Sequence, residues 1–151
     1  MSYKNSGFTL LELMIAVGVI VIALSGLLAV FSHLMSINEN AKNLTLAVTA
    51  CQDKLEQMRN SNFSTLYSTY NAAHFDPNGF RAADAEGAIS ITNTDPALLE
   101  VHVSVSWRTR SNMVIGEDKN LNGILDSGED LAPANGKLDS PAEIITLMCQ
   151  R

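Results

Sequence analysis

The longest feature in the pattern of apolar and polar positions is one uninterrupted apolar stretch near the N-terminus. From Leu13 to Phe31 every residue is apolar or glycine except Ser25, and none is charged. A helix of about 20 apolar residues, with ~17 as the lower edge, crosses the hydrocarbon core of a bilayer. The segment before it carries one cation, Lys4, and no acid, whereas acids and bases are mixed after Ser36. This charge difference predicts a cytoplasmic N-terminus and an exported body.

A secretory signal peptide has the same first two parts, a short basic start and an apolar core. Two features of this chain argue against one. The apolar stretch is longer than the ~7–15 residues of a signal-peptide core, and no cleavage site of small residues ends it. The segment that follows is Phe31-Ser32-His33-Leu34-Met35. We therefore expect the apolar segment to stay with the protein.

After the apolar stretch, the hydrophobic positions follow a helical period. Apolar residues spaced four, three, four and three positions apart lie in one stripe along a helix: Leu44, Val48, Cys51, Leu55 and Met58. Most charged residues of this segment fall outside the stripe. The pattern predicts that a helix continues from Ile37 to about Arg59 and packs this stripe into a core.

The second half of the chain changes to the alternation of β-strands. Residues 71–87 contain a proline and several Gly, Asn and Asp residues, which are typical of a loop. Residues 88–92 and 99–108 alternate between apolar and polar positions, and residues 93–96 form a turn between them. Residues 143–151 are predicted to be a last strand beside the second of these.

The alternation is clearest at 99–108. One face carries the apolar side chains of Val101, Val103, Val105 and Trp107. The other face carries His102, Ser104, Ser106 and Arg108. We expect the apolar face to be buried against the helix. A long N-terminal helix packed on a small antiparallel β-sheet is an α+β fold.

Size and charge exclude several classes of function. The chain has 151 residues, the size of one ordinary domain. It has 10 Lys and Arg residues against 16 Asp and Glu residues, for a net charge of −6. Because nucleic-acid binding depends on a basic surface, no nucleic-acid partner is expected. The histidines, His33, His74 and His102, belong to no catalytic motif, and no glycine-rich phosphate loop is present. We therefore expect no enzyme.

Acidic residues concentrate in the connection before the last strand, between Glu117 and Glu143. Residues 118–129 match the twelve-residue calcium loop D-x-[DN]-x-[DN]-G-x5-E at every defined position. Because Ca²⁺ prefers about six to eight oxygen ligands, this spacing predicts a calcium site. The expected ligands are Asp118, Asn120, Asn122, the carbonyl of Ile124, Asp126 through a water, and Glu129. The alternative is a solvated acidic loop without metal.

A weaker copy of this loop follows, because the sequence NGILDS at 122–127 recurs as NGKLDS at 135–140. Its candidate ligands are Asp130, Asn135, Asp139 and Glu143. Pro133 and Ala134 stand where oxygen ligands are needed, so the sequence leaves open whether one or two calcium ions bind. Since strands flank both copies, we interpret 116–143 as an EF-hand-like insertion in a sheet connection.

The two cysteines are a possible pair. Cys51 lies in the apolar stripe of the helix and Cys149 in the last predicted strand, and both are expected to face the core. An exported domain permits oxidation. A disulfide and two buried thiols remain equal alternatives.

Glu12 is an acid at the start of the apolar stretch. A carboxylate within a membrane segment costs ~2.5–3.5 kcal/mol on insertion scales, and it usually has a partner. Glu12 therefore either reaches the headgroup region or pairs with a group on another chain.

The start of the apolar stretch resembles the cleavage and N-methylation signal of type IV pilins and type II secretion pseudopilins, over Gly7-Phe8-Thr9-Leu10-Leu11-Glu12-Leu13-Met14-Ile15-Ala16. This resemblance implies that a prepilin peptidase cuts after Gly7 and methylates the amine of Phe8. It also implies that Glu12 pairs with the N-terminal amine of a neighbouring subunit. The implied architecture is the pilin one, a long helix packed on an antiparallel sheet.

A looser resemblance, to PilV-type minor pilins and I-type pseudopilins, lies in residues 51–59 with Phe63, Leu66 and Tyr70. Together the resemblances imply three parts of the chain. These parts are a leader at 1–7, a transmembrane and assembly helix at 8–35, and an exported globular domain at 36–151.

The implied function is a minor pilin that helps to initiate or cap a type IV pilus. Its expected partners are other pilin or pseudopilin subunits, the prepilin peptidase and the inner membrane. The chain would be a single-pass inner-membrane protein first and part of a periplasmic or extracellular filament later. One alternative is a pseudopilin of a type II secretion system. An alternative of another class is a membrane-anchored calcium-binding module that does not polymerise.

Overall fold

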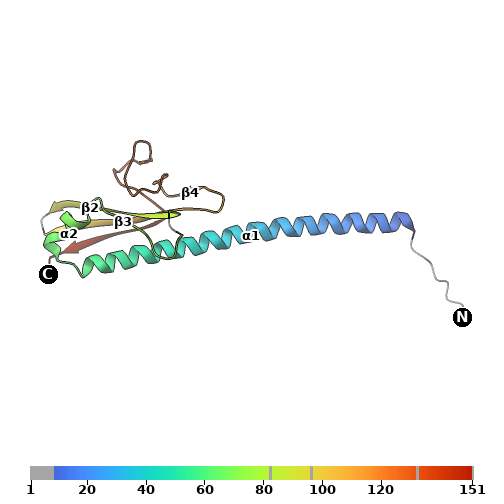
Figure 1. The fold of residues 1–151 in the computed structure, drawn as a ribbon, viewed down its shortest axis with the longest axis horizontal. Helices are drawn as coiled ribbons and strands as arrows, with labels where there is room; N and C mark the ends of the chain where they lie inside the picture. The colour runs from blue at the N-terminus through green and yellow to red at the C-terminus, as the bar shows by residue number, and fades with distance from the viewer. Residues whose placement is uncertain (1–8, 82, 96, 132, 151) are drawn as a thin grey trace. The chain divides into compact units, whose positions relative to one another are not determined.

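The structure is a computed structural model that describes residues 9–81, 83–95, 97–131 and 133–150. Its elements, drawn in Figure 1, are α1 (Leu10–Arg59), α2 (Phe63–Tyr70), β1 (His74–Phe75), β2 (Ala85–Asp95), β3 (Leu98–Arg108), β4 (Val114–Ile115) and β5 (Ala142–Cys149). The chain divides into two compact units, and the boundary lies between Glu39 and Asn40 within α1.

The first unit is the N-terminal part of α1. Its start is capped by Thr9, whose hydroxyl oxygen accepts a hydrogen bond from the backbone N–H of Glu12 at 3.3 Å. Every large apolar side chain from Leu10 to Ile37 is more than half exposed. Within the described residues, α1 is the helix that is long and apolar enough to cross a membrane. A helix that is apolar on all sides is stable when lipid or other protein surrounds it, and the first unit contains no other element to do so among the described residues.

The second unit is built on an antiparallel sheet with β3 at its centre. One edge of β3 pairs with β2, from Ala85 opposite Trp107 to Asp95 opposite Leu98. Its other edge pairs with β5 along 98–105 and with β4 at 107–108. The two-residue strand β1 pairs with β2. The predicted α+β fold is confirmed, and so are the strand at 99–108 and a last strand beside it.

The strand predicted at 88–92 is longer than expected. It begins at Ala85 and continues to Asp95, so the expected loop at 71–87 contains β1 and the start of β2, and the turn is shorter than 93–96. A register shift between Thr92 and Asp95 marks the end of regular pairing with β3. The small and polar residues at both ends of β2 have weak strand propensity, but the long partner strand β3 provides hydrogen bonds for them.

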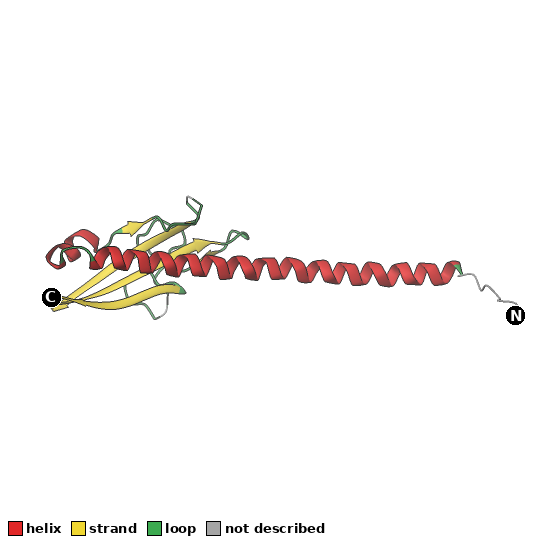
Figure 2. Ribbon diagram, turned by 90° about the horizontal axis from the view of Figure 1, so that it is seen from below, coloured by secondary structure: helices red, strands yellow, loops and turns green. Residues whose placement is uncertain are grey.

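The core of this unit lies between the C-terminal part of α1 and one face of the sheet. Figure 2 shows this part of the helix lying across the strands. The predicted apolar face of β3 is buried here against Cys51, Leu55 and Met58 of the helix stripe. Leu44 is exposed and Val48 is half-buried, while Ala47 and Ala50 are buried in their place. The helix therefore turns a slightly different face to the sheet than the spacing of large residues predicts.

The polar face of β3 is also buried, which differs from the expectation that only one face is covered. His102, Ser104 and Ser106 are all buried. The connection between β4 and β5 covers this face, as Figure 1 shows on the side of the sheet away from α1. Two serine hydroxyls between the sheet and this connection donate to backbone carbonyls. Ser104 donates its hydroxyl to the Leu138 carbonyl, and Ser140 of the connection donates to the Val105 carbonyl.

Candidate functional site

The first loop, residues 118–129, curls around the carboxylate of Asp118. This side chain is only 1% exposed. Its Oδ1 accepts a hydrogen bond from the backbone N–H of Asn122 at 3.1 Å, and its Oδ2 accepts one from Gly123 at 2.7 Å. Gly123 has a φ of 71°, in the left-handed region that glycine adopts without strain. The sharp turn predicted at this position is therefore present.

The two asparagines continue the curl. The side-chain oxygen of Asn120 accepts from the N–H of Asn122 at 3.1 Å, and that of Asn122 accepts from Ile124 at 2.8 Å. Asn and Asp side chains commonly stabilise tight turns in this way. Their amide nitrogens donate to Asp126 Oδ2, at 2.7 and 2.9 Å. All three side chains thus point toward one region of the loop.

Glu129 closes the loop from its other end and is only 4% exposed. Its Oε1 accepts from the backbone N–H of Lys119 at 2.9 Å, and its Oε2 accepts from that of Asp126 at 3.0 Å. None of the ion pairs formed among the described residues involves Asp118 or Glu129. Two buried carboxylates in one short loop therefore lack a basic side chain to offset the cost of burial.

The carboxylates of Asp118, Asp126 and Glu129 in the first loop are not all within 4.8 Å of one another. In the described part of the chain, one set of three His, Cys, Asp or Glu residues has ligand atoms all within 4.8 Å of one another, and it is His102, Asp139 and Glu143. The spacing predicts that Asp126 acts through a water, which requires a longer distance from the ion.

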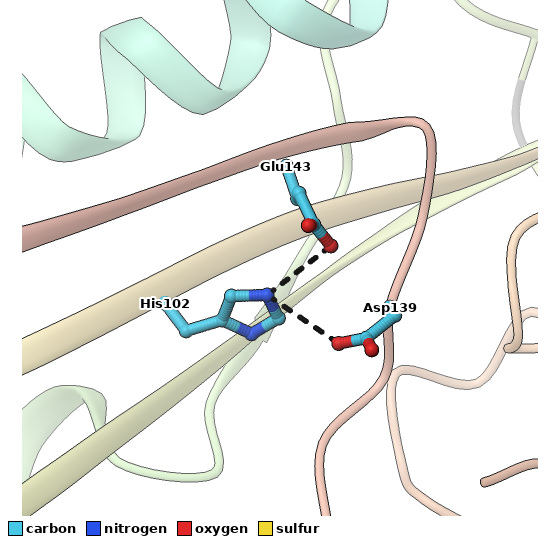
Figure 3. Close-up of side chains that lie close together, drawn as sticks. All are labelled: His102, Asp139 and Glu143. Atoms are coloured by element: carbon cyan, nitrogen blue, oxygen red, sulfur yellow. Dashed lines mark hydrogen bonds and ion pairs between the residues drawn. The ribbon is translucent and has the colours of Figure 1, made fainter. Parts of the chain in front are cut away.

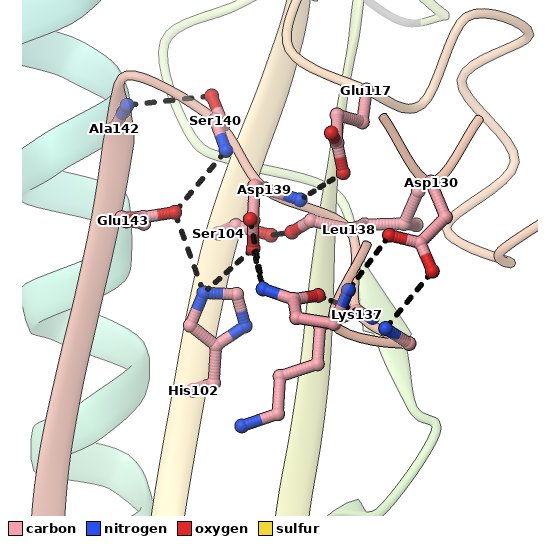
Figure 4. Close-up of polar contacts among 12 residues, drawn as sticks. His102, Ser104, Glu117, Asp130, Lys137, Leu138, Asp139, Ser140, Ala142 and Glu143 are labelled. Carbon is pink, nitrogen blue, oxygen red and sulfur yellow. Dashed lines mark hydrogen bonds and ion pairs between the residues drawn. The ribbon is translucent and has the colours of Figure 1, made fainter. Parts of the chain in front are cut away.

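The second loop, whose polar contacts Figure 4 draws, repeats hydrogen bonds of the first. Asp130 accepts from the backbone N–H groups of Asn135 and Gly136 at 3.0 and 2.9 Å. Asn135 accepts from the N–H of Lys137 at 2.8 Å and donates its amide to Asp139 at 2.9 Å. Gly136 has a φ of 75°, close to that of Gly123. The sequence repeat is thus a repeat of structure, despite its longer lead-in.

His102 joins the second loop, and sequence reasoning assigned it no role. It projects from β3 toward Asp139 of the loop and Glu143 of β5 (Figure 3). Its Nε2 lies 3.6 Å from Asp139 Oδ1 and 3.4 Å from Glu143 Oε2. Of the four predicted ligands of the second site, the structure brings Asp139 and Glu143 together at His102, while Asp130 accepts backbone N–H groups as Asp118 does in the first loop. The signal that could have found His102 is a histidine among small residues on a strand's polar face.

Each loop is also tied to the sheet. A Cβ on Gly123 would lie 2.3 Å from the Cβ of His74, so the first loop packs against β1. His74 Nδ1 lies 2.8 Å from Glu86 Oε1, and burial raises the pKa of Glu86 despite this contact. In the second loop, Lys137 Nζ donates to Glu100 Oε1 at 2.8 Å, which lowers the pKa of Glu100.

A cavity of about 310 Å³ lies between the two loop tips and the strands β2 and β3. Its lining includes Ile89, His102, Ile124 and Leu138. The loops therefore do not fill the whole face of the sheet.

The cysteines do not form the disulfide considered from the sequence, and both are free. Cys51 is buried beside the Ala142 carbonyl, and burial raises the pKa of its thiol to about 12. Cys149 is exposed, because Met148 takes the inward position at the end of β5. Ala142 and Cys149 are at opposite ends of β5, ~23 Å apart at the usual strand rise. A disulfide needs Cα atoms within about 7 Å.

The predicted processing site lies at the start of the chain. Gly7 and Phe8 are outside the described residues, and Glu12 lies in the first turn of α1. The chain matches the prokaryotic N-terminal methylation motif over residues 2–28. It carries a prepilin-type N-terminus. This motif supports a type IV pilin-like or pseudopilin-like protein, and it points to a structural subunit.

The motif implies processing by prepilin peptidase and assembly with other pilins. The apolar helix fits inner-membrane anchoring of such a protein. No curated protein and no solved structure shows significant similarity to the chain.

Proposed function

We propose that the chain is a minor pilin that helps to initiate or cap the assembly of a type IV pilus. The observation that carries this proposal is the methylation motif at 2–28, followed by a helix whose large apolar side chains are exposed from Leu10 to Ile37. Such a surface is stable in lipid before assembly and among the helices of other subunits afterwards. The same surface thus serves as membrane anchor and as assembly interface.

Processing prepares the N-terminus for this role. Cleavage after Gly7 exposes the amine of Phe8, which methylation leaves able to carry a positive charge. Glu12 of one subunit then pairs with this amine on a neighbour. In a region of low dielectric, either charge alone is costly, so correct register is favoured and misregister is penalised.

Calcium stabilises the exported domain in this proposal. Support comes from the buried carboxylates of Asp118 and Glu129 and from the side-chain oxygens of Asn120 and Asn122, with the backbone carbonyl of Ile124 as the further ligand proposed from the spacing. These are hard oxygen donors, which suit Ca²⁺. The amides of the two asparagines can rotate to present oxygen to an ion in place of their bonds to Asp126.

A pseudopilin of a type II secretion system is the second candidate, because the same motif and helix support it equally. A membrane-anchored calcium-binding module is the third, and it differs in one respect. Such a module does not require the charge of Glu12, whereas a pilin and a pseudopilin both need it for pairing with a neighbouring subunit.

The test is therefore the variant Glu12→Gln, which removes the charge at nearly constant size. We expect the full-length variant to reach the membrane and be cleaved normally but to be depleted from the filament fraction. Thr9→Ala is the matched control, because it removes the hydroxyl that caps the N–H of Glu12 while leaving the acid in place. Incorporation of Glu12→Gln at the wild-type level, at native expression, would rule out the pairing role. Incorporation of Thr9→Ala at a level as low as that of Glu12→Gln would instead assign the effect to helix capping.

A further inference from the structure

We propose that His102, Asp139 and Glu143 form a site for a divalent transition metal of the zinc type, separate from the calcium loop. This inference deepens the proposed function, because it replaces the second calcium ion predicted from the sequence with a different metal. It rests on three side chains from three segments: β3, the second loop and β5 (Figure 3).

The distances fit metal ligation, and the contact between His102 and Glu143 is a long hydrogen bond. His102 Nε2 lies 3.4 Å from Glu143 Oε2 and 3.6 Å from Asp139 Oδ1. A good N–H···O bond is about 2.7–3.2 Å long. Ligands at ~2.0–2.2 Å from a tetrahedral zinc ion lie about 3.3–3.6 Å from one another. The two distances from His102 therefore match those between neighbouring corners of such a tetrahedron, and all three ligand atoms lie within 4.8 Å of one another.

The site is buried at His102 and open to solvent at the two acids. The His102 side chain is 2% exposed, and the two carboxylates are each 37% exposed. The imidazole lies on the face of β3 that the β4–β5 connection covers, while the acids remain within reach of ions from solvent. Three protein ligands leave the fourth position for water or another group.

The surrounding contacts orient the acids and leave the charge unbalanced. Both oxygens of Asp139 accept from the amide of Asn135, at 3.1 and 2.9 Å, and Glu143 Oε2 accepts from the N–H of Ser140 at 3.3 Å. Bonds of this kind commonly position metal ligands. The nearby ammonium of Lys137 is paired with Glu100. The two carboxylates at one imidazole therefore provide negative charge that a divalent cation would offset.

The donor set selects against calcium. Ca²⁺ takes oxygen ligands almost exclusively, whereas imidazole favours Zn²⁺ and its neighbours among the transition metals. The first loop has only oxygen donors, and the second has gained a nitrogen donor from the sheet. The two loops share a backbone design but differ in the metal they favour.

The experiment uses the full-length chain in detergent micelles, stripped with chelator and then held in millimolar Ca²⁺ so that the first loop is occupied. Titration with Zn²⁺ is expected to show one site per chain, and Co²⁺ in its place should give the intense visible absorption of a tetrahedral complex. The variant Asp139→Asn with Glu143→Gln should weaken Zn²⁺ binding by about 100-fold or more. The ¹⁵N shift of the His102 imidazole should change with Zn²⁺ in the wild type alone.

The control is Asp118→Asn, which disrupts the first loop and should leave Zn²⁺ binding unchanged. His102→Gln should behave like the double variant, but because His102 is buried, the exposed acids provide the test if that variant does not fold. Equal Zn²⁺ affinity in the wild type and the double variant would overturn the proposal. Filament incorporation through Glu12 is read out separately, so either proposal can fail without the other.

Discussion

The two units of the chain obtain their order from different sources. In the first unit, every large apolar side chain from Leu10 to Ile37 is exposed, and its helical hydrogen bonds are the main internal contacts. In the second unit, apolar side chains from α1 and both long strands bury one another in a single core. The second unit therefore carries its own hydrophobic stabilisation, whereas the first must take its own from lipid or from other subunits. This division matches what a subunit needs if it is first a membrane protein and then part of a filament.

Truncating an apolar side chain in each unit tests this division most strongly. Met58→Ala removes a fully buried side chain from the second unit and should lower its free energy of unfolding by about 2–5 kcal/mol. Leu28→Ala makes a comparable truncation where the side chain is 67% exposed, and the unfolding of the second unit should not change. Fluorescence of Trp107, the single tryptophan and a buried one, reports the transition in detergent-solubilised chain. An equal loss in both variants would show that the first unit packs against the second.

Calcium removal tests whether every part of the second unit folds without a bound ligand. The first loop buries acids in place of apolar side chains, so its order should depend on a bound ion. At a hundredfold excess of Ca²⁺ over the dissociation constant, we expect ~2.7 kcal/mol of stabilisation and a higher melting temperature. Extracellular sites bind at ~10⁻⁴–10⁻³ M, so the shift should begin in the millimolar range and reach this size at about 10–100 mM Ca²⁺.

The matched variants separate the two loops. Asp118→Ala with Glu129→Ala should abolish the calcium shift, while Asp139→Ala should leave most of it. Identical melting curves of the wild type in millimolar calcium and in chelator would reduce the first loop to a solvated acidic insertion.

Two glycines with nearly the same backbone conformation lie in different surroundings in the two loops. Gly123 and Gly136 have φ values of 71° and 75°, so alanine at either should cost about 1–2 kcal/mol for the left-handed conformation. A Cβ at Gly123 would also collide with the Cβ of His74 at 2.3 Å, whereas nothing lies within 4 Å of one at Gly136. Gly123→Ala should therefore destabilise by a further ~1–3 kcal/mol. Chemical denaturation of the two variants measures the difference, and equal losses would mean that the first loop does not pack on β1.

Much of the fold could be predicted from local periodicity. The helical spacing that ends at Arg59 and the alternation at 99–108 both reflect one buried face against another, and each element formed where its pattern predicted. The long pairing of β2 was harder to foresee, because Ala85, Glu86 and Gly87 have weak strand propensity and join the sheet through their partner strand.

The candidate sites divide in the same way. The first loop is a contiguous motif, so its ligand candidates could be read from spacing alone. His102 could not, because its neighbours Asp139 and Glu143 are more than thirty residues away in sequence and meet it only through the fold of the connection and the pairing of β5 with β3. The polar residues of β3 also suggested a face exposed to solvent. Ser104 instead donates to the backbone of the loop that covers this face. Cys149 faced outward because a change of one position in a strand reverses the face.

The most direct test of the account is mass spectrometry of the N-terminus in sheared filaments from cells that express the chain at its native level. We expect a peptide that begins at N-methylated Phe8, and we expect it to disappear from the filament fraction when the prepilin peptidase is removed. Detection of the chain only in membranes, with residues 1–7 still attached, would contradict the assignment as a processed and assembled subunit.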